Sequence, residues 1–243
     1  SQSGGDTSSF AVRAQIVAGQ GLLVGTPILV NTVTDGFQAN PVITSLSNGN
    51  FIVGWEDTSG IGGMDTDSSA AKIQVFAQDG TRIGGEVQVN TTVAGFQTPS
   101  VITALDDGRF VVLIRESNGS DSPIRAQIFE SDGQKSGSEL LISATDRGAK
   151  DFPEVLALNG GGFVAVWEDR TRTGADNQAS AIRAQIVASD GSKVGSEILV
   201  NTTVNDSQRF PEIAKLAGGG FVIVWVDQRP FVSGATDTFD ARG

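Results

Sequence analysis

Several sequence landmarks recur along this chain of 243 residues with one shared period, and this repetition limits the fold more than any other feature. Four similar segments close on glycines that lie 59, 53 and 58 residues apart, at Gly21, Gly80, Gly133 and Gly191. A second series has the same spacings and ends at Asn31, Asn90, Ser143 and Asn201. A third series begins at Pro41, Pro99, Pro153 and Pro211. A shared period of this kind is typical of repeat architectures, in which each repeat is one supersecondary unit.

Each unit is expected to form four short strands. In the best-defined unit the first strand follows Pro153, the second begins at Phe163, the third begins at Ala181 and the fourth ends at Asn201. Their β-branched content and glycine-bearing turns are typical of antiparallel hairpins, and no window has a sustained helical period. The second strand, FVAVW from Phe163, is apolar on both faces, so its sheet should lie between two others. These features predict an all-β β-propeller of four-stranded antiparallel sheets.

The order of strands predicts how the ring closes. The chain begins with third and fourth strands (10–31), continues through units 41–90, 99–143 and 153–201, and ends with first and second strands (211–227). We therefore expect a single domain over 1–243 with four blades, the last a composite of 211–227 and 10–31. The tail from Asp237 does not fit, since it resembles another third strand. It is either a short overhang or a sign that the chain is part of a longer array.

Composition excludes several functions. The chain has no Cys, His or Tyr, which rules out disulfides, zinc fingers, cysteine nucleophiles and Ser-His-Asp triads. Its net charge of −11 disfavours binding to nucleic acid or to anionic lipid. No apolar run is long enough for membrane insertion. A bound metal would need oxygen ligands, which favours Ca²⁺ or Mg²⁺.

Acidic residues recur at the ends of second strands and in the loops that follow, and they are candidate ligands for Ca²⁺. The candidates are Asp6, Asp57, Asp65, Asp67, Asp121, Asp169, Asp176, Asp227 and Asp237. The alternative interpretation is that each aspartate caps its own turn or pairs with a nearby cation. The recurring basic residues Arg13, Lys72, Arg125 and Arg183 would supply such pairs.

Other side chains are candidates for ligand contact. Tryptophan recurs at one strand position, at Trp55, Trp167 and Trp225, where packing between blades is favoured over a sugar-stacking platform. Loop residues that do not recur are better candidates for a specific contact, because binding requires asymmetry. These candidates are Arg170, Arg172, Arg229 and Phe231.

Two segments, PEIAKLAGGGFVIVW (211–225) and AIRAQIVASDGSKVGSEILVN (181–201), resemble tandem repeats of large secreted bacterial proteins of the hemolysin-type calcium-binding and adhesin group. The resemblance implies a propeller-like, calcium-linked module of a longer chain that is extracellular or on the cell surface. The sequence departs from that group where Ile114 replaces tryptophan, and it lacks the G-G-x-G-x-D calcium nonapeptide.

Catalysis in this chain would depend on carboxylates, lysine or metal-bound water. Glu56, Glu116 and Glu168 are candidate acids for a glycosidase, but they look equivalent in successive units, which favours a structural role. The sequence therefore predicts a non-catalytic extracellular binding or scaffold module, whose loop-rich rim binds a protein or glycan. The alternatives are a carbohydrate-active hydrolase or lyase with paired carboxylates, and a structural spacer in an adhesin.

Overall fold

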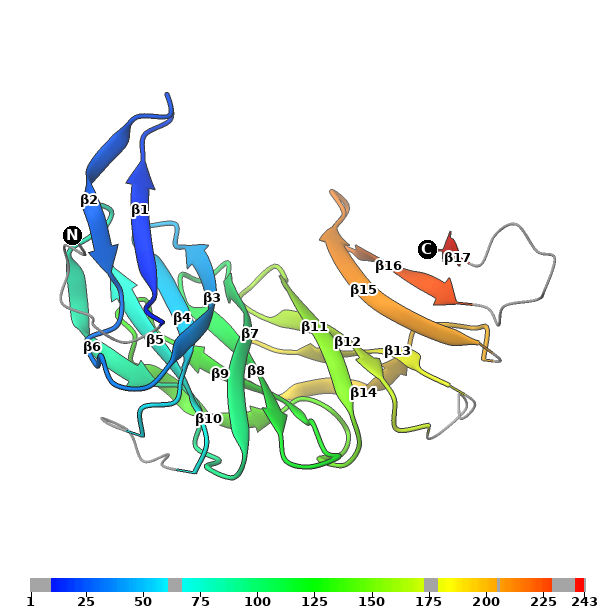
Figure 1. Ribbon diagram of the computed structural model, residues 1–243. Coiled ribbons are helices and arrows are strands. Elements are labelled where there is room, and N and C mark those ends of the chain that lie inside the picture. The colour runs from blue at the N-terminus through cyan, green and yellow to red at the C-terminus, as the bar shows by residue number, and fades with distance from the viewer. Residues whose placement is uncertain (1–9, 61–66, 173–178, 205, 229–238, 243) are drawn as a thin grey trace. The chain divides into compact units, whose positions relative to one another are not determined.

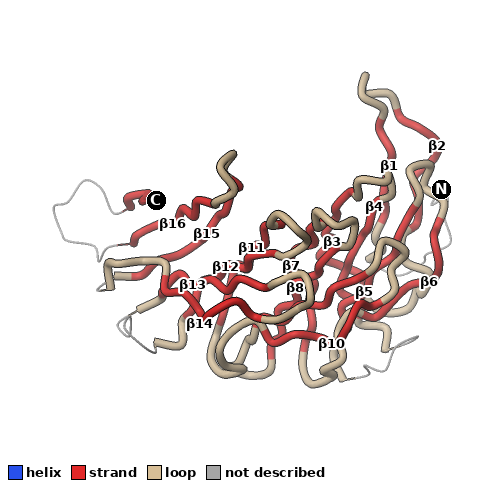
Figure 2. The backbone as a smooth tube through the Cα atoms, turned by 180° about the vertical axis from the view of Figure 1, so that it is seen from behind, coloured by secondary structure: helices blue, strands red, loops and turns tan. Residues whose placement is uncertain are grey.

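The computed structural model describes residues 10–60, 67–172, 179–204, 206–228 and 239–242 (Figure 1). Within these ranges the chain is all-β, and Figure 2 shows strands and loops with no helix. The all-β, antiparallel part of the prediction is thus confirmed. No helix in the described ranges is long and apolar enough to cross a membrane.

Three sheets each contain four consecutive strands in sequential order (Figure 1). The first contains β3 (Gln38–Ser45), β4 (Phe51–Asp57), β5 (Ala70–Phe76) and β6 (Arg82–Gln88). The second contains β7 (Phe96–Ala104), β8 (Phe110–Ser117), β9 (Ile124–Phe129) and β10 (Lys135–Leu141). The third contains β11 (Lys150–Ala157), β12 (Phe163–Asp169), β13 (Ala181–Val187) and β14 (Lys193–Leu199). These sheets correspond to the predicted units 41–90, 99–143 and 153–201.

The strands near the two ends form separate sheets. β1 (Arg13–Val17) pairs with β2 (Leu23–Leu29), while β15 (Ser207–Lys215), β16 (Phe221–Gln228) and β17 (Phe239–Arg242) form a three-stranded sheet. The predicted composite of 211–227 and 10–31 is not found, because β17 pairs with β16 and takes the third-strand place. Residues 239–242 repeat the third-strand pattern. Pairing with the nearby β16 closes a shorter loop than pairing with the other end of the chain, so the entropy cost of loop closure is lower. The blade number stays a prediction.

The first strands begin before their prolines, not after them as predicted. In β3, β11 and β15 the register shifts at the proline, so that its missing N–H falls in a bulge outside the ladder. The residue before each of these prolines has a positive φ: 52° at Asn40, 49° at Phe152 and 56° at Phe210. Side chains other than glycine and asparagine rarely adopt this conformation. Each bulge therefore turns one side chain out of the regular alternation of its strand.

A glutamine in each third strand stabilises a second irregularity. The pairing of β5 with β6 shifts register between Ile73 and Val75, next to Gly84 with a φ of 66°. The Nε2 atom of Gln74 donates to the carbonyls of Val75 (2.9 Å) and Ile83 (3.0 Å), and so supplies donors where the ladder is interrupted. This explains why an amide is buried among apolar residues. The glutamines that bond in the same way are Gln15, Gln127 and Gln185.

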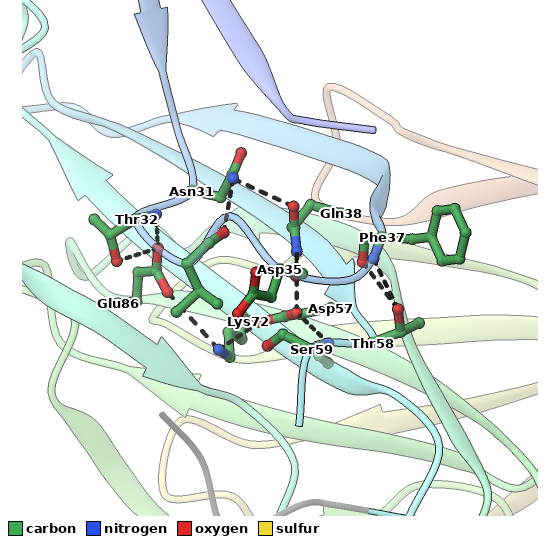
Figure 3. A network of polar contacts seen from close by, with 12 residues as sticks. Asn31, Thr32, Asp35, Phe37, Gln38, Asp57, Thr58, Ser59, Lys72 and Glu86 are labelled. Atoms are coloured by element: carbon green, nitrogen blue, oxygen red, sulfur yellow. Dashed lines mark hydrogen bonds and ion pairs between the residues drawn. The ribbon is translucent and has the colours of Figure 1, made fainter. Parts of the chain in front are cut away.

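A polar network connects the end of one sheet to the next (Figure 3). Asn31 accepts from the amide of Val12 (2.9 Å) and donates to Gln38 (3.3 Å). Gln38 in turn donates to Asp57 (3.4 Å), which pairs with Lys72. Equivalent bonds join Asn90 to Gln97 and Asn201 to Gln208. The recurring asparagines that define the period are therefore connectors between sheets.

One connector carries a charge instead of an amide. Ser143 and Lys150 stand where the other units have asparagine and glutamine, and Lys150 is only 1% exposed. Its Nζ atom donates to the carbonyl of Arg147 (2.5 Å), three residues earlier, as Gln38 does to Asp35 (2.6 Å). Burial lowers the pKa of Lys150, and the Asp169 carboxylate opposes that shift in part. The lysine thus keeps the hydrogen bond at the cost of a buried charge.

The chain divides into two compact units, each with its own core. The first comprises Ser1–Ala104, Gly108–Ile114 and Gln127–Glu139, and one of its core clusters includes the stacked rings of Phe110 and Phe129, 5.1 Å apart. The second comprises Leu105–Asp107, Arg115–Ala126 and Leu140–Gly243. Its core is built on β12, in which every residue is buried as predicted for a second strand. The single-domain expectation stays a prediction.

Candidate functional site

The aspartates that end the second strands pair with the recurring cations. Asp169 contacts the Nε atom of Arg183 at 2.7 Å, with 4% and 12% of the two side chains exposed. Asp57 pairs with Lys72, and both side chains are buried. These ion pairs agree with the alternative interpretation at these two positions, and metal binding there stays a prediction.

The other candidate metal ligands in the described ranges each accept a hydrogen bond from the protein. Asp227 accepts from Gln208 (3.3 Å), Asp121 from the amide of Gly148 (2.7 Å) and Asp67 from the amide of Gly95 (2.9 Å). No group of three acidic residues in the described ranges is placed to hold a metal ion. Four candidates lie outside the described residues: Asp6, Asp65, Asp176 and Asp237. Calcium binding stays a prediction.

The recurring tryptophans are core residues. Trp55 and Trp167 are fully buried, and Trp225 is partly buried against the core of the second unit. A sugar-stacking platform would have to be exposed, so packing is the role that the structure supports.

A cavity of about 370 Å³ lies in the second unit, where β12 and β15 meet the loop before β13. Its lining residues are Glu168, Arg170, Arg172, Ala179, Ser180, Ser207 and Arg209. It brings together Arg170 and Arg172, two of the four predicted ligand contacts. The other two, Arg229 and Phe231, lie outside the described residues. Arg209, Ser180 and Ser207 were not predicted as site residues from the sequence.

Glu168 is the acidic residue of this cavity and is fully buried. Its Oε1 atom accepts a hydrogen bond from the Nε atom of Arg170 (2.7 Å) and lies 3.4 Å from the Nε atom of Arg209. Its Oε2 atom accepts no hydrogen bond from the described residues. The bond to Glu168 raises the pKa of Arg170. A buried carboxylate oxygen without a donor is costly, and it marks a place where a ligand can supply one.

Glu168 belongs to a row of alternating charges within the second unit. Asp151 lies 3.5 Å from Arg115 and 3.4 Å from Arg170, and Arg170 continues the row to Glu168 and Arg209. Arg170 therefore contacts two carboxylates, which hold its guanidinium at the cavity wall. Fixing of this kind is required of groups that bind or react with a ligand.

The three candidate acids are not equivalent, contrary to the expectation from sequence. Glu56 lies opposite Ala71 and Glu168 opposite Ile182, one residue before the aspartate that ends each strand. Glu116 instead pairs with Arg125 (2.9 Å), as Asp169 does with Arg183, so it replaces the aspartate. The prediction compared residue types and not register. The residue at the register position of Glu168 therefore differs between units, with Arg115 there in the second sheet. The recurrence of glutamate in other units is thus no argument against a catalytic role for Glu168.

Two exposed aromatic residues adjoin the cavity. The rings of Phe152 and Phe210 meet edge to face with centroids 4.7 Å apart, and 45% and 44% of the two residues are exposed. The guanidinium of Arg209, a lining residue, stacks over the Phe210 ring at 4.7 Å. Both phenylalanines are the positive-φ residues of their bulges. Strained backbone that presents exposed side chains is a feature of functional sites.

No protein-family model and no curated protein sequence matches the chain, but solved structures do. The GH93 α-L-arabinofuranosidase of Fusarium graminearum, in complex with arabinobiose, matches with a TM-score of 0.58 and 13% identity, over 83% of this chain and 60% of that one. The α-L-arabinanase of Penicillium chrysogenum, also with arabinobiose, matches with a TM-score of 0.55 and 16% identity, over 84% and 61%. The Hadza microbial sialidase Hz136 matches with a TM-score of 0.58 and 13% identity, over 90% and 48%.

These matches show the fold, a β-propeller, and the chain spans less than two-thirds of the length of each of these three proteins. The predicted resemblance to hemolysin-type calcium-binding and adhesin repeats is wrong, since the similar structures are glycoside hydrolases. The quoted motifs describe what a sheet of this fold requires: an apolar second strand and tight glycine turns. The prediction of a non-catalytic binding or scaffold module is contradicted by the same matches, which agree with its alternative.

Proposed function

We propose that this chain is a carbohydrate-active hydrolase domain that cleaves glycosidic bonds at the cavity beside Glu168. One observation carries the proposal: a buried carboxylate has an oxygen without a donor at a cavity wall, within a fold shared with glycoside hydrolases. A polymeric glycan is an extracellular substrate, so an extracellular or cell-surface location is part of this proposal.

Two carboxylates suffice for this chemistry. Glycosidases use one carboxyl group to exchange a proton with the glycosidic oxygen and a second as base or nucleophile. Glu168 takes the second role through Oε2, because a base or nucleophile acts as a carboxylate, and Arg170 and Arg209 contact Oε1 as partners of a carboxylate. Asp151 takes the first role, since it lies 3.4 Å from the same Arg170 and its side chain is 22% exposed. The arginines also stabilise negative charge that develops on the carboxylates.

The remaining lining residues support a glycan ligand. Ser207 and Ser180 place hydroxyl groups at the wall, and the hydroxyl of Ser180 donates to the carbonyl of Gln208 (2.9 Å). Hydroxyls and guanidinium groups are the hydrogen-bonding partners that sugar hydroxyls need. A few such groups fix the orientation of a ligand in a site of this size.

The experiment is a turnover assay on arabinan, arabinoxylan, pectin and sialylated glycans, with release of reducing sugar as the measurement. We expect the wild-type chain to cleave at least one of them, and Glu168→Gln to lower kcat by about 10²- to 10⁴-fold. Glu56→Gln is the matched control, because Glu56 has the same register position but bonds to Asn40 (2.7 Å) and Thr98 (3.2 Å). It should retain activity within about twofold.

Two results would overturn the proposal. The first is a wild-type chain that cleaves none of these polymers, or a Glu168→Gln variant as fast as wild type. The second is an unsaturated uronate product, which absorbs in the ultraviolet and would show elimination instead of hydrolysis.

A further inference from the structure

We propose that the sugar unit bound in this cavity carries a carboxylate, which is held by Arg172 together with Arg170 and Arg209. The inference deepens the proposed function and depends on it for the glycan class. Three of the lining residues are arginines and one is a glutamate, in a chain whose net charge is −11. Positive charge gathered at a cavity of an acidic protein favours an anionic ligand.

Arg172 is the arginine best placed to bind a new partner. Arg170 is engaged by Glu168 and Asp151, and Arg209 by Glu168 and Gln228. Arg172 is exposed at the cavity wall, and it forms no ion pair or hydrogen bond with the residues that the structure describes. Its φ of 54° holds the backbone in the left-handed region. A guanidinium without a carboxylate partner binds carboxylates through two parallel hydrogen bonds.

The ligand must also supply a hydrogen-bond donor for the Oε2 atom of Glu168, and this limits the chemical classes of ligand that fit the cavity. The Oε2 atom of Glu168 would repel a simple inorganic anion, while a neutral sugar would offer Arg172 only uncharged hydroxyl acceptors, which bind a guanidinium more weakly than a carboxylate does. An acid sugar has both groups: its carboxylate can meet the arginines and its hydroxyls can donate to Oε2. The lining therefore fits a uronate or sialic acid unit better than a neutral pentose.

The aromatic pair provides a place for the neighbouring part of the chain. Phe210 carries Arg209 on its ring and contacts Phe152, and both phenylalanines are almost half exposed. The apolar face of a sugar ring packs well on an exposed aromatic side chain. We place the sugar next to the acid unit on Phe210.

The test is calorimetric titration of the whole chain with two pairs of ligands that differ in a carboxylate. One pair is trigalacturonate and its carboxyl-reduced neutral form, and the other is sialyllactose and lactose. We expect at least one acid form to bind about tenfold more tightly than its neutral partner, and its affinity to fall as salt rises. Arg172→Gln should lower affinity for that acid form about tenfold and leave the neutral form unchanged.

Arg147→Gln is the matched control, because it removes one positive charge from another exposed loop of the same unit. Equal affinity for acid and neutral forms, absence of binding to both acid forms, or equal losses in the two arginine variants would overturn the inference. Full competition by inorganic phosphate at equal concentration would also overturn it. Cleavage of neutral arabinan with no acid preference would leave the hydrolase proposal intact, whereas acid-specific binding without cleavage of any polymer would contradict only the hydrolase.

Discussion

Glu168 and Glu56 occupy the same register position in β12 and β4, yet Glu168 contacts two arginines while Glu56 accepts from an asparagine and a threonine. The backbone that carries them is the same in both sheets. The contrast arises at two positions, because Arg170 follows Glu168 where Thr58 follows Glu56, and Arg209 of the next first strand stands in the place of Thr98. A distinct site can therefore form within a repeat without any change in the ladder that supports it.

The ion pair between Asp169 and Arg183 should contribute to stability. Asp169→Asn removes the nearer carboxylate from a nearly buried guanidinium, whose contact with Glu197 is 3.1 Å. We expect a loss of about 3 kcal/mol in the free energy of unfolding, measured by urea denaturation. The control is Lys215→Gln, which removes an exposed pair with Asp106 (3.3 Å) and should cost less than about 1 kcal/mol. Similar losses in both variants would contradict the prediction.

The tryptophans should respond as core residues and not as ligand contacts. In a Trp225→Phe variant, emission from Trp55 and Trp167 should be blue-shifted, resist acrylamide and stay unchanged when glycan is added, because both side chains are fully buried. Trp167→Ala should cost about 3–5 kcal/mol in unfolding free energy. Quenching of these two tryptophans by a bound sugar would show that the packing interpretation is wrong.

Lys150 should make the free energy of unfolding depend on pH in the alkaline range. Burial lowers its pKa below 10.5, so the folded chain binds fewer protons than the unfolded chain at high pH. Stability of the wild type should therefore rise with pH between the folded pKa and about 10.5, relative to a chain without this lysine. Lys150→Gln lacks this group, so the stability of the wild type relative to this variant should increase as the pH rises through that range. Thermal unfolding at several pH values measures both trends.

The double variant Ser143→Asn with Lys150→Gln separates charge from hydrogen bonding. It restores the pair seen at Asn31 and Gln38, so it should exceed Lys150→Gln by about 1 kcal/mol. A wild type that loses stability relative to Lys150→Gln as the pH rises would contradict the lysine prediction.

Phe210→Asn should separate binding from folding. Asn40 occupies the same bulge position with a φ of 52°, and asparagine tolerates this conformation better than phenylalanine. We expect unfolding free energy to change by less than about 1 kcal/mol, because strain relief offsets lost contacts. Affinity for the glycan should fall several-fold, as measured by calorimetry. An unchanged affinity would show that the ring does not contact the sugar.

Much of the fold could be predicted because the same strand and turn residues recur in each unit and form the same hydrogen bonds. The apolar strand from Phe163, the glycine turns and the pairing of Asp57 with Lys72 follow from residue types at fixed spacing. In the sequence, the pairing of β17 with β16 was indicated only by a tail that did not fit the predicted ring. Which of two similar third strands pairs with β16 depends on the entropy cost of loop closure, which residue types do not show.

The site was harder to predict because it depends on register between segments far apart in sequence. Arg209 meets Glu168 only because the bulge at Phe210 sets where the first strand lies. A residue before proline is normally extended, so the positive φ of Phe210 had no local signal. One signal was available: counting from Ile114, which replaces tryptophan, places Glu116 at the aspartate position.

The amide connectors have a further consequence for how this chain can change. Asn201 binds backbone groups and Gln208, and Gln208 donates to the terminal Asp227, so the two amides fix neighbouring sheets without involving the side chain that precedes that aspartate. That side chain is Glu56, Arg115, Glu168 or Val226 in the four units. The residue at this one position of each repeat can therefore change during evolution without loss of the hydrogen bonds between sheets. New specificities can then arise by duplication of a repeat followed by single substitutions.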